Sequence, residues 1–210
     1  MSPALQSDAT VHVVDDDDSM RRSVVFLAES VGWRARGFVD AESFLAQADC
    51  SAVGCLVLDI RMPAMSGLEL QQVLQERGIG IPILFITGHA DISMAVQALK
   101  SGAADFIEKP FEDQVLLDAV ATAVRRSAQA LEESQARARA RAALDTLSPR
   151  EREVARLVAQ GQPNKAVAAL LGISEKTVHI HRHHVMRKVD ISSAAELARL
   201  MLKADPAALD

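Results

Sequence analysis

The feature that most constrains the fold is a change in hydrophobic periodicity near residue 124. Before it, short apolar runs alternate with amphipathic helical segments. The apolar runs cover residues 11–14, 33–39, 55–59, 83–87 and 106–107. The helical segments lie near 19–31, 41–48, 67–76, 91–101 and 112–124. Strands that alternate with helices at this spacing indicate βαβ units, so we expect a doubly wound α/β domain with five parallel strands.

From Leu147 onwards the pattern is purely helical. Ser148 is followed by Pro149 and, three residues on, by Glu151, which is the signature of a capped helix start. Residues 121–144 contain no Gly or Pro, so we expect the preceding helix to run on as a helical linker; a flexible tether is the alternative. The predicted domains are residues 1–124, a linker over 125–144 and an all-α domain of four helices over 145–210.

Residues at the predicted helix ends have identifiable capping roles. Ser19 is expected to cap the first helix and Asp40 the second. Gly32 is expected to end the first helix in a left-handed turn. The two cysteines, Cys50 and Cys55, are too few for a disulfide framework and are expected to be reduced packing residues.

The charge distribution differs between the two parts. Residues 1–124 carry 8 Lys and Arg against 18 Asp and Glu, a net charge of −10, whereas residues 125–210 carry 15 against 10, a net charge of +5. A basic helical part suggests a polyanionic partner, and an acidic α/β part suggests a metal site or a cationic partner. No run approaches the roughly 18 to 20 apolar residues of a membrane span, and no secretory signal is recognisable, so we expect a cytoplasmic protein.

Polar residues follow the predicted strands at the edge where open parallel sheets bind ligands. Asp15 and Asp16 follow the first strand, Asp59 ends the third, Thr87 ends the fourth and Lys109 follows the fifth. Carboxylates that converge in this way repel one another unless a cation lies between them, and hard oxygen ligands favour Mg²⁺. An aspartate can attack phosphorus to form an acyl phosphate while a lysine neutralises the developing charge.

Four motifs, VVDDDD, LVLDIRMPAMSG, ITGHAD and FIEKPF, resemble in order and spacing the receiver domain of bacterial two-component response regulators. The resemblance implies a sheet of order 2-1-3-4-5 with Asp59 as the phosphoacceptor. It implies that Asp16, Asp59 and the backbone carbonyl of Arg61 ligate the metal, with Asp15 acting through a water. It assigns phosphoryl binding and switching to Thr87, Lys109 and Phe106, and implies a cis peptide bond before Pro110.

The apolar spacing over residues 164–188 predicts two helices joined by a tight turn at 172–174, which is a helix-turn-helix. Ser174 would cap the second helix, which would enter a major groove. A solvated amphipathic helix, or one that binds protein in an adaptor, is the alternative. Position 163, just ahead of the first of these two helices, is a proline, so we expect the entry to that helix to differ from one that is capped by a serine.

The stretch that begins LSPREREVARLVAQG and ends ISSAAEL resembles the LuxR-type DNA-binding domain, and both parts together resemble the NarL/FixJ family. The resemblance implies that base edges are contacted by His179, Ile180 and His183. It implies that DNA phosphates are held by Asn164, Lys165, Lys176, Thr177 and Arg182. His179 replaces a more usual lysine, which leaves base reading by this residue open.

We therefore expect a phosphorylation-dependent transcription regulator rather than an enzyme. The implied partners are a sensor histidine kinase, double-stranded DNA, RNA polymerase and, on phosphorylation, a second copy bound through the helix at 91–101 and the strand at 105–109. A metal-dependent phosphohydrolase is the rival from another class. It would need a general acid two residues after the nucleophile, where this chain has Arg61.

Overall fold

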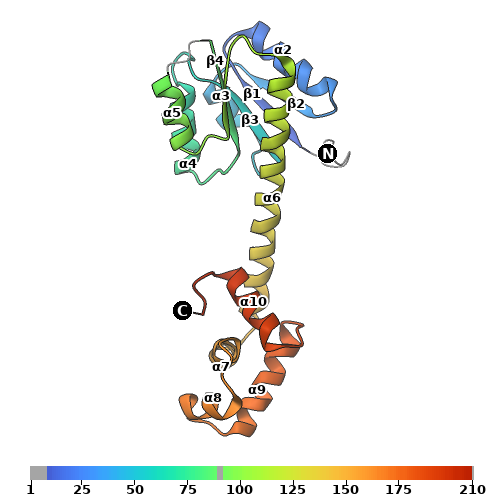
Figure 1. The fold of residues 1–210 in the computed structure, drawn as a ribbon, viewed down its shortest axis with the longest axis vertical. Coiled ribbons are helices and arrows are strands. Elements are labelled where there is room, and N and C mark those ends of the chain that lie inside the picture. Colours follow the sequence, from blue (N-terminus) through green and yellow to red (C-terminus); the bar gives the residue numbers. More distant parts are fainter. Residues whose placement is uncertain (1–8, 89–91, 210) are drawn as a thin grey trace. The chain divides into compact units, whose positions relative to one another are not determined.

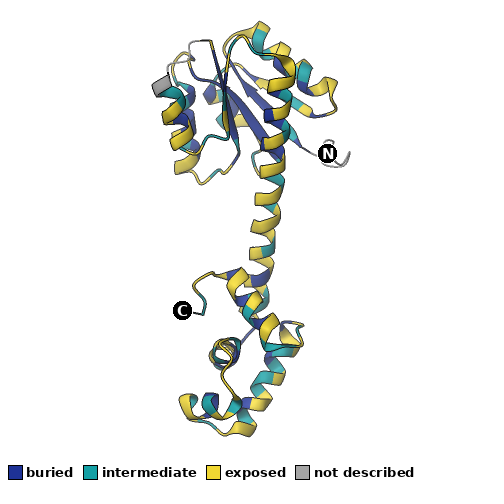
Figure 2. Ribbon diagram, in the orientation of Figure 1, coloured by how far each residue is buried: buried dark blue, intermediate teal, exposed yellow. Residues whose placement is uncertain are grey.

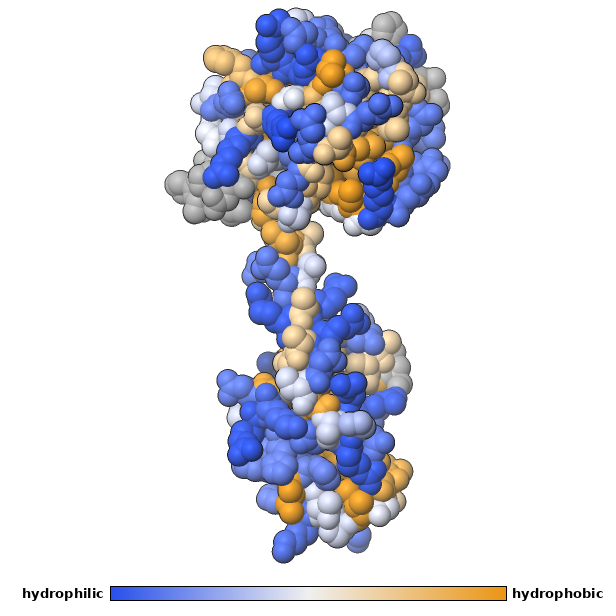
Figure 3. Space-filling model, turned by 180° about the vertical axis from the view of Figure 1, so that it is seen from behind, coloured by the Kyte–Doolittle hydropathy of each residue, from blue (hydrophilic) through white to orange (hydrophobic). Residues whose placement is uncertain are grey.

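The computed structural model describes residues 9–88 and 92–209 (Figure 1). Its internal contacts divide the chain into two compact units, Met1–Leu131 and Glu132–Asp210. The first contains a sheet and the second contains only helices among the described residues. On the face that Figure 3 displays, the surface of each unit is mostly hydrophilic with smaller hydrophobic areas between.

The first unit is built on a five-stranded parallel sheet of order β2-β1-β3-β4-β5, which confirms the predicted α/β class and topology. The strands are β1 (Thr10–Val14), β2 (Arg34–Phe38), β3 (Gly54–Asp59), β4 (Ile83–Thr87) and β5 (Asp105–Glu108). All six residues of β3 and all five of β4 are buried. The dark blue of the central strands in Figure 2 marks this burial. Continuous burial is expected of central strands that are covered on both faces.

Alternate residues along each strand feed two separate cores, one on each face of the sheet. Val11, Val13 and Val57 pack with helices α2 (Asp18–Ser30) and α6 (Asp113–Asp145). The intervening residues, such as Leu56 and Leu58, pack with the helices of the other face. These are α3 (Ala41–Gln47), α4 (Gly67–Glu76) and α5 (Ile92–Lys100). The doubly wound arrangement therefore follows from the period of two in side-chain direction along a strand.

Two of the three predicted helix-end roles are confirmed and one is wrong. Asp40 caps α3, and Gly32 has a φ of 93° just after α2. The first helix is capped by Asp17 rather than Ser19. The Asp17 carboxylate accepts the backbone N–H of Ser19 at 2.8 Å and that of Met20 at 3.3 Å. An aspartate two positions ahead of the serine therefore caps the helix, which begins at Asp18.

Helix α6 is continuous from Asp113 to Asp145 and spans the division between the two units. The second unit contains the end of α6 and four further helices. These are α7 (Pro149–Ala159), α8 (Asn164–Leu171), α9 (Glu175–Lys188) and α10 (Ala194–Ala204). Their apolar residues form one core that includes Val154, Val167, Val178, Val185 and Leu197.

Candidate functional site

The ends of three strands bring a lysine and two aspartates into direct contact. Nζ of Lys109, just after β5, lies 2.8 Å from Oδ2 of Asp15 and 2.8 Å from Oδ1 of Asp59. Asp15 directly follows β1 and Asp59 is the last residue of β3. Both aspartates are buried, so the ammonium group neutralises carboxylates that are largely shielded from water.

The two sides of this contact respond differently to burial. Burial raises the pKa of the Asp15 carboxyl, and the hydrogen bond from Lys109 only partly opposes this. Burial alone would lower the pKa of Lys109, but its bonds to Asp15 and Asp59 together outweigh burial and leave that pKa raised. One ammonium shared between two carboxylates stays charged more readily than the deeper carboxylate does.

The backbone around Asp59 holds its carboxylate in place. The N–H of Arg61 donates to Oδ2 of Asp59 at 2.8 Å, and the N–H of Gly67 donates to the carbonyl of Ile60 at 2.9 Å. A Cβ atom on Gly67 would lie 2.3 Å from the Asp59 carbonyl oxygen. Glycine at this position therefore lets the first turn of α4 approach the strand end.

The remaining predicted residues of this edge differ in exposure. Thr87 is buried at the end of β4, and its carbonyl accepts the N–H of Lys109 at 2.8 Å. Phe106 is half-buried in β5, and Asp16 is exposed. The peptide bond between Lys109 and Pro110 is cis, as the resemblance implies. Within the described residues, no three His, Cys, Asp or Glu side chains are assembled as a metal cluster.

In the second unit, α8 and α9 form the helix-turn-helix that the spacing predicts. Gly172 ends α8 with a φ of 66°, and Ser174 caps α9 by accepting the N–H of Thr177 at 3.1 Å. Val178 and Val185 turn one face of α9 into the core. The start of α8 has Pro163 at its N-cap and no side-chain hydrogen bond there, as the sequence indicates.

The predicted DNA contacts lie mainly on the exposed side of these two helices. Exposed positions are Lys165, Lys176, His179, Ile180 and His183. Asn164, Thr177 and Arg182 are half-buried. Nη1 of Arg182 donates to Oδ1 of Asn164 at 3.3 Å, so these two side chains join α9 to the start of α8.

The comparisons with known proteins cover both units. Residues 11–121 match the model of the response regulator receiver domain, and residues 145–201 match that of bacterial regulatory proteins of the luxR family. The transcriptional regulatory protein FixJ of Rhizobium meliloti is 45% identical over 196 residues, and the match covers 93% of this chain and 96% of that protein. The chain is a response regulator of the NarL/FixJ family.

Two further relatives agree with this assignment. Nodulation protein W of Bradyrhizobium diazoefficiens is 49% identical over 192 residues, which cover 91% of this response regulator and 85% of that protein. The solved structure of the response regulator StyR has a TM-score of 0.84 at 43% identity and covers 93% of this chain and 99% of that one. In residues 9–88 and 92–209, no helix is long and apolar enough to cross a membrane.

Two contacts that assemble the helix-turn-helix of this response regulator could not be predicted from the sequence. Arg150 donates to the carbonyl of Leu171 at the end of α8, and Lys188 at the end of α9 donates to Glu151. Glu151 was recognisable only as the capping partner of Ser148. Its second role joins residues 37 positions apart, which local spacing cannot reveal.

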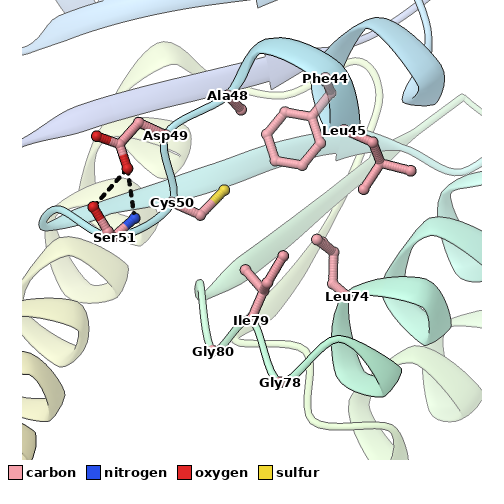
Figure 4. Close-up of a pocket in the computed structure, with 10 residues that line it drawn as sticks. All are labelled: Phe44, Leu45, Ala48, Asp49, Cys50, Ser51, Leu74, Gly78, Ile79 and Gly80. Carbon is pink, nitrogen blue, oxygen red and sulfur yellow. Dashed lines mark hydrogen bonds between the residues drawn. The ribbon is translucent and has the colours of Figure 1, made fainter.

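The receiver unit also has a cavity of about 430 Å³ that the sequence gives no sign of. Figure 4 shows Phe44, Leu74, Cys50 and Ile79 around it, while Asp49 is hydrogen-bonded to Ser51. Its lining comes from α3, the end of α4 and the loops that precede β3 and β4. These loops enter the strands at their amino ends, so the cavity lies at the edge of the sheet opposite Asp59.

Proposed function

We propose that this response regulator accepts a phosphoryl group on Asp59 from the phosphohistidine of a sensor kinase and that phosphorylation controls DNA binding. The observation that carries the proposal is the contact of Lys109 with both Asp15 and Asp59 at the carboxyl edge of the sheet. A buried aspartate with a shared counter-ion suits a nucleophile whose product carries additional negative charge.

In the proposed step, a carboxylate oxygen of Asp59 attacks the phosphorus of the phosphohistidine. The new P–O bond forms as the P–N bond breaks, and the electron pair of that bond returns to the imidazole nitrogen. The ammonium of Lys109 neutralises the charge on the phosphoryl oxygens. The hydroxyl of Thr87, at the end of the neighbouring strand, donates a hydrogen bond to one of them.

A magnesium ion at Asp59 would draw the nearby aspartates together, since no three acidic side chains among the described residues are already assembled as a metal cluster. Asp15, Asp16 and Asp59, with the backbone carbonyl of Arg61, are hard oxygen donors of the kind that Mg²⁺ prefers. When bound, Mg²⁺ would draw charge from the phosphoryl oxygens and lower the repulsion between phosphate and carboxylate.

The DNA-binding part of the proposal uses the exposed side of α8 and α9. Lys165 and Lys176 would contact phosphates together with Asn164, Thr177 and Arg182, and His179, Ile180 and His183 would face base edges. Bound in this way, the protein would recruit RNA polymerase at promoters in the cytoplasm.

Dimerisation is proposed to follow phosphorylation through α5 and β5. Val96 and Leu99 are exposed on α5 at 44% and 47%, and Lys100 ends the helix. An exposed apolar pair flanked by a charge suits a two-fold interface in which each copy presents the same patch. Paired copies would then bind two DNA half-sites about one helical turn, roughly 10 base pairs, apart.

The first test measures incorporation of phosphate from acetyl phosphate with Mg²⁺. We expect the wild type to gain one phosphoryl group by mass spectrometry and Asp59→Asn to gain none. Asp49→Asn, which alters an exposed aspartate at the opposite edge, is the control and should be labelled normally. Normal labelling of the Asp59→Asn protein would overturn the assignment.

The second test uses a gel shift with DNA selected from genomic fragments. Acetyl phosphate should tighten binding of the wild type and leave Asp59→Asn unchanged. Equal binding with and without the phosphodonor would refute phosphorylation control. Failure to bind any fragment would favour a protein-binding adaptor.

A further inference from the structure

The C-terminal turn of α5 is held by contacts from outside the helix. The last carbonyls of an α-helix have no partner within it and need other donors. Here the N–H of Ala103 donates to the carbonyl of Ala98 at 3.0 Å, and Gly102 takes a left-handed φ of 82°. This turn supplies some of the hydrogen-bond donors that the carbonyls at the helix end need, and side chains of α4 supply others.

Two glutamines of α4 donate to these carbonyls. Nε2 of Gln71 lies 3.2 Å from the carbonyl oxygen of Ala98 and 2.9 Å from that of Ser101. Nε2 of Gln75 also donates to Ser101. Gln71 and Gln75 are four residues apart, so both face α5 from the same side of α4. We call these four residues the amide clamp.

The part of the amide clamp that Gln71 and Ala98 form is buried. Gln71 is 3% exposed and Ala98 is fully buried, packed in the core that α3, α4 and α5 share. A buried amide that loses its partner carbonyl cannot turn to water instead. The contact therefore fixes one end of α5 more firmly than apolar packing alone would.

On its solvent side the clamp borders a groove of about 400 Å³ that is lined mainly by glutamines. Its lining residues include Gln71, Gln72, Gln75 and Gln97. Hydrogen bonds across this groove thus add to the apolar packing that joins the two helices. Hydrogen bonds depend on direction, so they hold α5 at a defined position along α4.

The clamp lies beside the surface that the proposed function uses for dimerisation. Leu99 and Lys100 fall between its two acceptor carbonyls along the chain, and Val96 is one turn before them. The opposite end of α5 follows β4, whose last residue is Thr87. A change at the phosphoryl site would therefore enter α5 at the end remote from the clamp.

We propose that Gln71, assisted by Gln75, is a positioning residue that holds the C-terminal end of α5 so that phosphorylation turns the helix about this end. The inference rests on the proposed function, because it assigns a cause to the placement of the proposed dimer surface. With the clamp intact, Leu99 and Lys100 keep their position relative to α4 while the rest of α5 moves. Without it, the same signal displaces the helix without a defined axis.

The test compares Gln71→Leu with Gln72→Leu in the full chain. Gln72 is exposed on the same helix, and its side-chain amide donates to Glu76 of the same helix at 2.9 Å. Gln71→Leu should accelerate amide hydrogen exchange at Ser101 to Ala103 by about tenfold without phosphodonor, since exchange there reports local opening. Gln72→Leu should exchange as the wild type does.

The second arm measures dimerisation by sedimentation equilibrium with Mg²⁺ and beryllofluoride. The gain in association over the untreated protein should fall by about tenfold in Gln71→Leu, the loss expected when buried hydrogen bonds are removed. Labelling of Asp59 by acetyl phosphate should keep its wild-type rate. A merely structural defect would lower both labelling and dimerisation, so this separation is the decisive readout.

Each outcome has a definite meaning. Wild-type exchange and wild-type dimerisation in Gln71→Leu would overturn the inference while leaving the proposed function intact. A wild-type protein that is not labelled on Asp59 would contradict the proposed function first. If Gln71→Leu fails to fold, Gln75→Ala, at an exposed position, decides by the same two measurements with smaller shifts in the same direction.

Discussion

Oε2 of Glu151 lies 2.6 Å from Nζ of Lys188, so the first turn of α7 is bonded to the last turn of α9. The same carboxylate oxygen accepts the backbone N–H of Ser148 at 2.8 Å. The hydrogen bond from Lys188, followed by that from Ser148, lowers the pKa of Glu151 from 4.5 to about 2. This one side chain therefore caps α7 and anchors the end of α9.

The Glu151 contact predicts how the second unit responds to acid. Its pKa is lower in the folded protein, so the contact stabilises the fold fully above about pH 4.5 and is lost as pH falls towards 2. Glu151→Gln should remove this part of the acid transition. The measurement is the far-ultraviolet circular dichroism transition that occurs without a change in Trp33 fluorescence, since Trp33 lies in the receiver core. The exposed Glu153→Gln should retain the wild-type profile.

Gly67→Ala should destabilise the receiver unit. Its Cβ would meet the Asp59 carbonyl oxygen at 2.3 Å, and such overpacking costs about 1 to 3 kcal/mol of unfolding free energy. Denaturant titration followed by Trp33 fluorescence measures this loss. Gly80→Ala is the matched control, because a Cβ there meets nothing within 4 Å. Equal midpoints for the two variants would contradict the steric argument.

His12 predicts a second pH effect, in the receiver. Its ring is buried against Phe38 and Phe44, with centroids 5.9 and 5.7 Å away. Burial lowers the pKa of His12 below 6.5, so the unfolded chain binds the proton first and unfolding becomes easier as pH falls below about 6.5. The Trp33 unfolding midpoint should therefore drop between about pH 7.5 and 5.5. A His12→Phe protein with the same slope would show that another group is responsible.

Replacing Lys176 and replacing Ile180 should change DNA binding in different ways. Lys176→Ala should weaken binding to all sequences alike and lower the salt dependence by about one counterion, as expected for a phosphate contact. Ile180→Ala should keep the salt dependence but lose preference at one base pair, because an apolar side chain can contact a thymine methyl group. Fluorescence anisotropy across a salt series separates the two. Lys203→Ala, on α10, should match the wild type.

Much of the fold could be predicted because its determinants are local. The runs at 11–14, 55–59 and 83–87 show strand length and burial directly, and the polar residue at each strand end follows from the sheet topology. The capping motif at Ser148 is equally local and is found as predicted, with the Glu151 N–H donating to the Ser148 hydroxyl.

Contacts between distant residues could not be read in the same way. In the sequence Gln71 is an ordinary helix former. Only the structure shows that its amide donates to carbonyls at the end of α5, 27 and 30 positions further along the chain. The order of the strand ends places Lys109 at the same edge as the aspartates, but its direct contact with Asp15 and Asp59, 94 and 50 positions away along the chain, could not be predicted. At the first helix, Asp17 and Ser19 are both residue types that cap helices, and Asp17 is the N-cap because its carboxylate accepts two backbone N–H groups.

The different burial of the two thiols lets their alkylation report how often the receiver unit opens. Burial raises the pKa of Cys55 to about 12, and only the thiolate reacts with an alkylating reagent, so Cys55 in β3 is protected twice over. Burial also raises the pKa of the Cys50 thiol, but Cys50 is only half-buried, so we expect it to be alkylated before Cys55 in the native chain. The rate at which the second alkyl group is added, at Cys55, therefore measures how often the receiver unit opens. This measurement needs no mutation and no added dye.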